Sequence, residues 1–288
     1  MTDLRIDPLT GRPVVVVGPR QDRPNLPADG CPFCPGGLEA PEPYTVRWFP
    51  NRWPPLPDAR AEVLLYSPDH DGSMATLGRE GATAVVELWA DRTRDLGCRD
   101  DVAYVLIFEN RGPEVGATIA HPHGQLYAFN AVPPEPAAEL AGTTCRLCAL
   151  IDPAPSDRRV ASAEGWTAMV PPAPSWPYEL LVLPDAHIPD LPAVVDRGGA
   201  AAMAGILGAT LGRLDALFDA PMPYMLWVHQ RPTDGEAWPG AHVHVHVAPL
   251  YRSPGTPRFV AAGELGSGVH FNPVTPADAA AQLRAARP

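Results

Sequence analysis

The sequence predicts an α+β fold built from two tandem half-domains, each a mostly antiparallel sheet with flanking helices. Short runs of β-branched and aromatic residues outnumber helical patterns along the 288 residues. The same order of motifs occurs twice, which indicates a pseudo-two-fold unit. Proline is abundant, at 38 residues, and is spread through turns, so the connections between elements should be short.

In the first half, five strands and one helix are expected. The valine run at 14–17 and the apolar segments EVLLY and AYVLIFE are typical of strands. Apolar residues recur every three to four positions between 80 and 96, which indicates one face of a helix. The expected strands of this half span residues 14–17, 44–49, 62–66, 103–109 and 125–130.

In the second half, four strands and two helices are expected. The segment HVHVHVAPL alternates, so its three histidines share one face of a strand. A long helical pattern rich in Ala and Leu covers 198–218, and a shorter one covers 276–286. The expected strands of this half span residues 166–170, 179–183, 224–229 and 242–250.

The two halves have matching motif spacings. Each contains a Cys-x-x-Cys pair, a strand that leads to a histidine, a helix, a further strand and a His-x-His segment. The second cysteine precedes the next histidine by 36 residues in the first half and 39 in the second. That histidine precedes the His-x-His segment by 51 and 55 residues. The repeat predicts domains at 1–135 and 136–288, with the junction in the Pro- and Ala-rich stretch 132–142.

The charge pattern excludes several chemistries. The chain has 33 acidic and 22 basic residues, a formal net charge of −11, and every basic residue is an arginine. Without lysine there is no P-loop lysine, no Schiff base and no lysine general base. The acidic balance argues against binding to nucleic acid or to an anionic membrane. Phosphate chemistry would therefore depend on arginine, histidine, backbone N–H groups or a metal ion.

The cysteines and the N-terminal segment favour the cytoplasm. The odd count of five cysteines, four of them in Cys-x-x-Cys pairs, argues against a disulfide framework and favours metal binding. The segment MTDLRIDPLTGRP has no apolar core of the kind a secretory signal requires. No uninterrupted apolar run approaches the length of about 20 residues that spans a bilayer.

Two sets of Cys and His residues have the composition of closed zinc sites. Two thiolates and two imidazoles satisfy tetrahedral zinc and leave no open position, so such sites would be structural. The first set is Cys31, Cys34, His70 and His121, and the second is Cys145, Cys148, His187 and His242. A competing set for the second metal is Glu139, His229, His244 and His246. An alternative for His244 and His246 is a hydrogen-bonded core pair left from a duplicated active site.

The segment HPHGQ, residues 121–125, has the properties of a reactive centre. If a metal ion holds His121, the side chain of His123 on the same strand face is rigidly aimed. A neutral imidazole is a competent nucleophile towards phosphorus near neutral pH. Gln125 points to the same side and can donate to a phosphate oxygen, and Gly124 permits close approach of a ligand. The alternative role for His123 is to support the metal ligands.

These motifs together resemble the galactose-1-phosphate uridylyltransferase family of the histidine-triad superfamily. The resemblance covers nearly the whole chain, and it implies that both half-domains are histidine-triad-like. The segments that carry it are DPLTGRPVVVVGPRQDRP, CPFC, SPDH, FENRGPEVGATIAHPHGQ, VPPAPSWPYELLVLPDAH and HVHVHVAPLYRS.

The resemblance implies a double displacement in which His123 takes UMP from UDP-glucose and passes it to galactose 1-phosphate. Gln125 would support the transferred group, and no organic cofactor is needed beyond one or two structural zinc ions. The family usually completes the hexose site across a homodimer interface. The implied substrate contacts are Arg20, Arg23, Asn110, Gly116 and Thr118 for phosphate, Phe49 and Asn51 for uridine, and Arg258, Phe259 and Glu264 for the hexose.

The chain departs from the family pattern at the nucleotide and hexose sites and in the second cysteine pair. Arg52 follows Asn51 where many members have an acidic residue, Arg258 replaces a lysine and Gly263 replaces a tyrosine. The best-known bacterial members bind the second metal through Glu and three His, whereas Cys145 and Cys148 resemble a branch that includes a plant nucleotide-sugar phosphorylase. Thiolates favour zinc, so the second cysteine set is preferred.

Three alternative functions remain open. A phosphorylase of ADP-glucose or of a dinucleoside polyphosphate would use the same nucleotidyl-histidine. A histidine-triad hydrolase would release the nucleotide to water. A zinc-stabilised binding module would have no catalysis.

Overall fold

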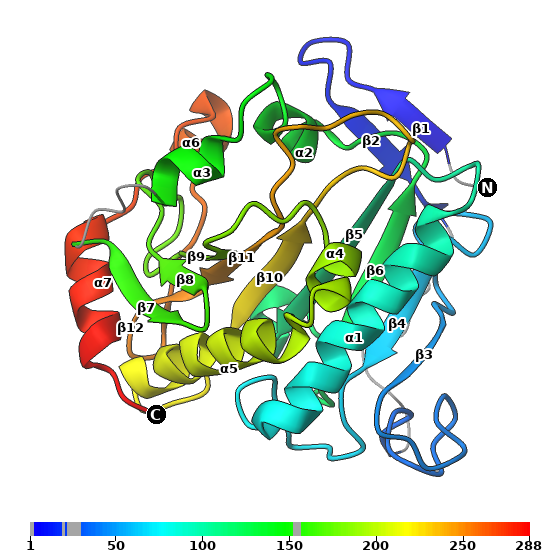
Figure 1. Ribbon diagram of the computed structural model, residues 1–288, viewed down its shortest axis with the longest axis horizontal. Coiled ribbons are helices and arrows are strands. Elements are labelled where there is room, and N and C mark those ends of the chain that lie inside the picture. Colours follow the sequence, from blue (N-terminus) through cyan, green and yellow to red (C-terminus); the bar gives the residue numbers. More distant parts are fainter. Residues whose placement is uncertain (1–2, 19–20, 22–29, 152–156) are drawn as a thin grey trace.

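A single nine-stranded antiparallel sheet forms the centre of the molecule (Figure 1). The computed structural model describes residues 3–18, 21, 30–151 and 157–288. The strand order is β3-β4-β6-β5-β10-β11-β9-β8-β7. The strands are β3 (Arg47–Pro50), β4 (Ala61–Leu65), β5 (Tyr104–Arg111), β6 (His123–Phe129), β7 (Arg159–Ala163), β8 (Trp166–Met169), β9 (Leu180–Pro184), β10 (Tyr224–His229) and β11 (His244–Pro249).

Two small hairpins lie outside this sheet. The first consists of β1 (Asp3–Ile6) and β2 (Pro13–Val16), and every residue of both strands is exposed. The second consists of β12 (Tyr251–Ser253) and β13 (Thr256–Pro257) and follows β11 directly.

Helices cover one face of the sheet, where α1 (Gly78–Gly97) packs against α5 (Ala200–Leu217) and α4 (Leu191–Asp196) (Figure 1). By length and composition α5 could cross a membrane, but half of it is buried in the protein, as in a core helix. The other helices are α2 (Pro134–Glu139), α3 (Arg146–Ile151), α6 (Ala262–Ser267) and α7 (Pro276–Ala285). A 3₁₀ turn, η2 (Pro113–Val115), follows β5.

The pairing of β5 with β10 joins the two halves of the sheet about a local pseudo-two-fold axis. Phe108 faces Gln125 on one side and Trp227 on the other, and Trp227 in turn faces His246. Gln125 and His246 therefore occupy equivalent positions in the two halves. The register likewise makes His123 equivalent to His244.

The α+β prediction is confirmed, and the principal strands and helices lie close to their expected positions. The strand expected at 44–49 begins only at Arg47, because Tyr44 turns inward and its hydroxyl contacts the carbonyl oxygens of Phe33 and Ser67. The expected junction 132–142 contains the helix α2. Since the two halves share one sheet, the domain boundary at 135 and 136 stays a prediction.

Candidate active site and metal centres

The imidazole of His123 is held in one tautomer at the start of β6. Burial alternates along this strand, so His123 and Gln125 share the face opposite to buried Gly124. His123 Nδ1 lies 2.7 Å from the carbonyl oxygen of His121. A carbonyl oxygen only accepts hydrogen bonds, so Nδ1 carries the proton and the neutral ring has its lone pair on Nε2. This is the protonation state that a histidine nucleophile requires.

A cavity of about 200 Å³ opens beside this imidazole. Its wall includes the side-chain amide of Gln125 and the polar side chains of Asn110 and Thr118, which the family resemblance assigns to phosphate binding. Gly116 in its wall has a φ of 87°, a left-handed conformation that glycine adopts without strain. The lining residues are Phe108, Asn110, Gly116, Ala117, Thr118, His123, Gln125 and Tyr127.

An aromatic wall borders the same imidazole. The ring of Phe33 lies edge-on to His123, with centroids 5.1 Å apart, and its centroid is 5.7 Å from that of Phe49. Asn51 Nδ2 donates to Gln125 Oε1 at 3.4 Å. Phe49 and Asn51, which the family resemblance assigns to uridine, therefore lie close to His123 and Gln125. Phe33 was missed, and the signal that could have identified it is its place between Cys31 and Cys34.

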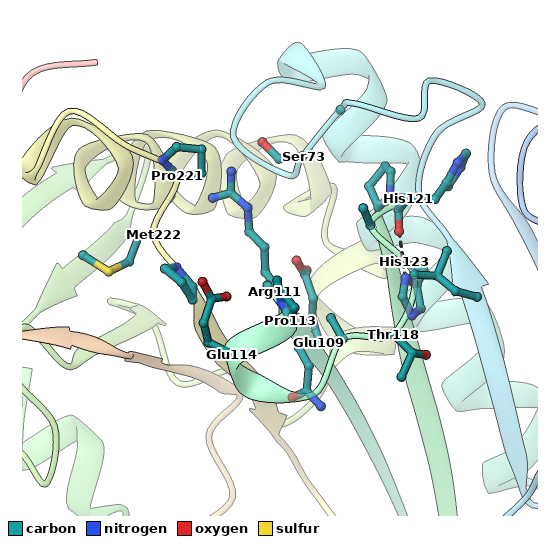
Figure 2. A pocket seen from close by; sticks show the side chains of 18 residues that line it. Ser73, Glu109, Arg111, Pro113, Glu114, Thr118, His121, His123, Pro221 and Met222 are labelled. Carbon is teal, nitrogen blue, oxygen red and sulfur yellow. Dashed lines mark hydrogen bonds between the residues drawn. The ribbon is translucent and has the colours of Figure 1, made fainter. Parts of the chain in front are cut away.

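A larger cavity of about 480 Å³ lies at the end of β5 and the start of β6, and the turn η2 forms part of its wall. Figure 2 shows Glu109 and Arg111 reaching into it from β5, with Ser73 and Met222 on other parts of its wall. Arg111 Nη1 donates to the Asp215 carboxylate at 2.7 Å. Burial raises the pKa of Glu109 to about 7, so this carboxyl is uncharged below neutral pH.

The first predicted metal set is assembled. Cys34 Sγ lies 3.5 Å from His70 Nδ1 and 3.6 Å from His121 Nδ1, and the four ligand atoms, with that of Cys31, lie within 4.8 Å of one another. His121 Nε2 donates to the Ser67 carbonyl at 2.7 Å, which leaves Nδ1 as the metal-binding atom. Burial lowers the pKa of His121, which keeps the ring neutral, as metal binding requires.

Tyr44 supports this set and was missed from the sequence. Its hydroxyl lies 2.8 Å from His121 Nε2 and 2.7 Å from the carbonyl oxygen of Phe33. The side chain therefore connects the cysteine turn to the histidine whose own carbonyl holds His123. No periodicity marks Tyr44, because it belongs to a loop.

The second cysteine set is also assembled. Cys145 Sγ and Cys148 Sγ lie 3.4 Å and 3.5 Å from His242 Nδ1, and Cys148 Sγ lies 3.4 Å from His187 Nδ1. His242 Nε2 donates to the Pro184 carbonyl at 3.0 Å, and burial lowers the pKa of His242 to about 4. This arrangement repeats that of the first set.

The third set, proposed from the sequence as a competitor, is assembled separately. Glu139 Oε2 lies 2.7 Å from His229 Nδ1 and 3.2 Å from His244 Nε2, and Glu139 Oε1 lies 3.4 Å from His246 Nε2. Burial raises the pKa of Glu139, but hydrogen bonds from the three imidazoles outweigh it and hold the pKa far below its usual value. The second and third sets share no residue, and which of them binds the second metal stays a prediction.

The remaining predicted contacts are not gathered at His123. Arg20 and Arg23 lie outside the described residues. Arg258 Nη2 donates to Glu264 Oε1 at 2.5 Å, and its guanidinium lies 4.5 Å from the centre of the Trp176 ring. Phe259 is 77 % exposed. Within the described chain, none of Arg258, Phe259 and Glu264 lines either cavity beside His123.

Comparison with known proteins gives two family matches and close full-length relatives. Residues 57–133 match the galactose-1-phosphate uridyl transferase N-terminal domain, and residues 149–285 match the corresponding C-terminal domain. The galactose-1-phosphate uridylyltransferase of Thermotoga maritima is 34 % identical over 313 residues, covering 99 % of this chain and 98 % of the relative.

Solved structures agree in fold. A uridylyltransferase structure superposes with a TM-score of 0.89 at 29 % identity and covers 99 % of this chain and 98 % of that one. An ADP-glucose phosphorylase from Arabidopsis thaliana with bound ADP-glucose superposes with a TM-score of 0.78 at 24 % identity, covering 99 % and 98 %, which supports a shared fold alone.

Proposed function

The chain belongs to the galactose-1-phosphate uridylyltransferase family, and from this membership we propose that it transfers UMP from UDP-glucose to galactose 1-phosphate through a covalent bond to His123. The observation that carries the proposal is the hydrogen bond from His123 Nδ1 to the His121 carbonyl, 2.7 Å long. It fixes the lone pair on Nε2, beside a cavity that contains amide and hydroxyl donors.

The transfer has two matched steps. His123 Nε2 attacks the α-phosphorus, the N–P bond forms, and the bond to the leaving oxygen of glucose 1-phosphate breaks. A phosphate oxygen of galactose 1-phosphate then attacks the same phosphorus, the N–P bond breaks, and UDP-galactose leaves. During both steps the proton stays on Nδ1 and is donated to the His121 carbonyl oxygen, which stabilises the positive charge of the nucleotidylated ring.

The donors around the phosphorus have separate roles in this proposal. Gln125 and Thr118 donate to the non-bridging oxygens, and Asn110 orients the phosphate chain from β5. Phe33 and Phe49 contact the base, and Asn51 holds the Gln125 amide oxygen so that the NH₂ group turns towards the phosphate. Arg20, Arg23, Arg258, Phe259 and Glu264 stay assigned to substrate binding by family resemblance.

Zinc fits both cysteine sets, because thiolate and imidazole donors in fours match its preferred tetrahedron. The first set would fix His121, and through the His121 carbonyl the ring of His123. A zinc ion there supplies structural order, and the transfer is carried by the side chains. The third set, with Glu139 and three imidazoles, suits a further divalent ion, and metal analysis of the purified protein would give the number bound per chain.

A phosphorylase is the second candidate function. The specific observation in its favour is the assembled second cysteine set, which resembles the branch that contains the plant enzyme. An ADP-glucose phosphorylase of Arabidopsis thaliana is 24 % identical over 98 % of this chain. In that reaction inorganic phosphate, instead of a sugar phosphate, would accept the nucleotidyl group from His123.

Intact mass spectrometry tests both candidates. Mixing the protein with UDP-glucose should add one UMP, and adding galactose 1-phosphate should remove it. The His123→Ala variant should gain no adduct, whereas His270→Ala, which changes the one histidine outside the metal sets and the nucleophile, should keep it. An AMP adduct formed only from ADP-glucose and discharged by inorganic phosphate would replace the transferase by the phosphorylase. An adduct on the His123→Ala protein would reject the covalent mechanism.

The enzyme is further proposed to be a cytoplasmic homodimer. None of the five cysteines, all within the described residues, is in a disulfide, which is compatible with a reducing compartment. Two exposed apolar surfaces support self-association. The hairpin surface consists of Leu4, Ile6, Val14, Val15 and Val16, and the C-terminal surface consists of Phe259, Leu265, Val269 and Phe271.

A further inference from the structure

A buried polar cluster lies under the strand that carries His123, on the opposite face of the sheet. Its members are Tyr66, Trp89, Glu109 and Tyr224, none of them more than 5 % exposed. The Tyr224 hydroxyl donates to Glu109 Oε1 at 2.8 Å. Among the described residues, Tyr66 Oη, Trp89 Nε1 and Glu109 Oε2 are buried without a hydrogen bond of standard geometry, although Tyr66 interacts with both Trp89 and Glu109 closely enough to shift its pKa. A buried polar atom that is left unpaired costs about 1–3 kcal/mol, and imperfect pairing recovers only part of that cost, so packing alone does not account for the cluster.

The second half of the protein serves as an internal comparison. The pairing of Phe108 with Trp227 makes Glu109 equivalent to Val228 and Gly124 equivalent to Val245. Val228 and Val245 are register partners and are completely buried. The half that lacks the nucleophile thus has two packed valines at these positions. The half that contains His123 has a carboxyl and a glycine there instead.

The cluster contacts the backbone between His123 and Gln125. A Cβ atom added to Gly124 would lie 2.1 Å from Tyr66 Oη and 2.9 Å from Tyr66 Cζ, so the tyrosine occupies the space of the missing side chain. Glu109 follows Phe108, which pairs with Gln125, so the carboxyl lies beside Gly124 on the next strand. The main chain of this glycine therefore has the reacting side chains on one face and the cluster on the other.

We propose that Tyr66, Glu109 and Tyr224 form a positioning cluster that holds the main chain at Gly124, so that His123 Nε2 and the Gln125 amide are aimed at one phosphorus. The inference rests on the proposed role of His123. Burial raises the pKa of Glu109 to about 7, so below neutral pH the carboxyl is mostly protonated and can both accept from Tyr224 and donate. An uncharged cluster can be held under the sheet without the desolvation of a full charge.

The decisive variant gives position 109 the valine that the second half has at the equivalent position. Glu109→Val combined with Tyr224→Phe removes the carboxyl together with the tyrosine hydroxyl that donates to it. The variant should fold with a melting temperature no lower than that of the wild type, because buried polar atoms are removed. Its rate of nucleotidyl-histidine formation should fall about 100-fold with KM changed less than about threefold, since a small misplacement of a nucleophile has that effect.

Two further variants separate positioning from general packing. Glu109→Gln keeps the size of the side chain and its capacity for hydrogen bonding. Its rate of nucleotidyl-histidine formation should therefore stay within about tenfold of the wild-type rate. Tyr104→Phe is the matched control, because Tyr104 is a completely buried tyrosine on the same strand as Glu109. Its hydroxyl accepts from the backbone N–H of Gln230 at 3.3 Å. The rate of this variant should equal that of the wild type.

A measurement independent of turnover completes the test. In the double variant, hydrogen exchange of the Gly124 and Gln125 amides should be about tenfold faster than in the wild type, and ¹⁵N NMR should show a loss of the Nδ1–H tautomer of His123. Unchanged exchange and tautomer, or a wild-type rate of adduct formation in the double variant, would overturn the inference. If the wild type forms no adduct at all, the proposed function fails, and the exchange data still decide whether the cluster holds this strand.

Discussion

At the scale of single residues, Gly124 shows how a correct motif can be given the wrong physical reason. The sequence suggests that a glycine between His123 and Gln125 lets a ligand approach the main chain. In the structure the missing side chain points to the buried face, where Tyr66 Oη fills its place. The strand alternation could have predicted this direction. The tyrosine that fills the space comes from the end of β4, and its contact depends on how neighbouring strands are aligned.

The Gly124→Ala substitution should therefore be severe. A methyl group 2.1 Å from Tyr66 Oη forces the tyrosine or the strand to move, with an expected loss of about 3 kcal/mol of folding free energy. Urea unfolding measures the loss, and adding Tyr66→Phe should recover part of it. Gly266→Ala is the control, since its Cβ would meet nothing within 4 Å. Equal stability of the two alanine variants would contradict the assigned contact.

Glu109 should give the protein a measurable pH dependence of stability. Its pKa is raised by burial from 4.5 to about 7, so the folded state retains a proton that the unfolded state releases. The stabilisation is complete below pH 4.5 and decreases as pH rises, until it is lost above about pH 7. Between pH 5 and 7 the wild type should lose about 2–3 kcal/mol more than Glu109→Gln in parallel urea titrations. Equal losses of unfolding free energy in the two proteins would show that this carboxyl ionises with its ordinary pKa.

At the scale of elements, the sequence predicts metal ligands better than the groups that orient them. Cys-x-x-Cys pairs and His-x-His segments have fixed spacings, so the first two sets were predicted residue by residue. Tyr44 and Phe33 belong to loops, where no period links a residue to its contacts. The sequence predicts a linker at the position of helix α2, which supplies Glu139, because the helix is short and two of its six residues are prolines.

The Tyr44→Phe variant tests whether the tyrosine orients the first metal set. Its hydroxyl contacts His121 Nε2, and loss of such a supporting contact typically weakens metal binding by about 10- to 100-fold. Competition with a zinc chelator measures the change. Tyr251→Phe is the control, because that hydroxyl donates to Glu114, away from all three metal sets. Equal zinc retention by the two variants would show that Tyr44 is dispensable for the site.

At the scale of the whole molecule, the repeat predicted two similar halves but not their union in one sheet. Motif order and spacing identify the copies, whereas the β5–β10 pairing that joins them depends on contacts between residues more than a hundred positions apart. That pairing places the His123 site and the Glu139 set at equivalent positions in the two halves. The first half has the amide side chains of Asn110 and Gln125, which suit phosphate. At the equivalent positions the second half has imidazoles.

The exposed hairpin β1–β2 should be part of a dimer interface. An isolated two-stranded hairpin is at best marginally stable in water. In this hairpin the apolar side chains of both strands are exposed to solvent, with Leu4 and Ile6 each 60 % exposed. A second copy of the chain would cover them. Light scattering coupled to size exclusion should give twice the chain mass of 30.8 kDa.

The Ile6→Asp and Val15→Asp double variant should elute as a monomer, because two carboxylates would be buried without partners. Leu38→Asp, at an equally exposed leucine outside both apolar surfaces, should remain dimeric. A wild-type protein that runs as a monomer at micromolar concentration would remove the dimer from the proposal.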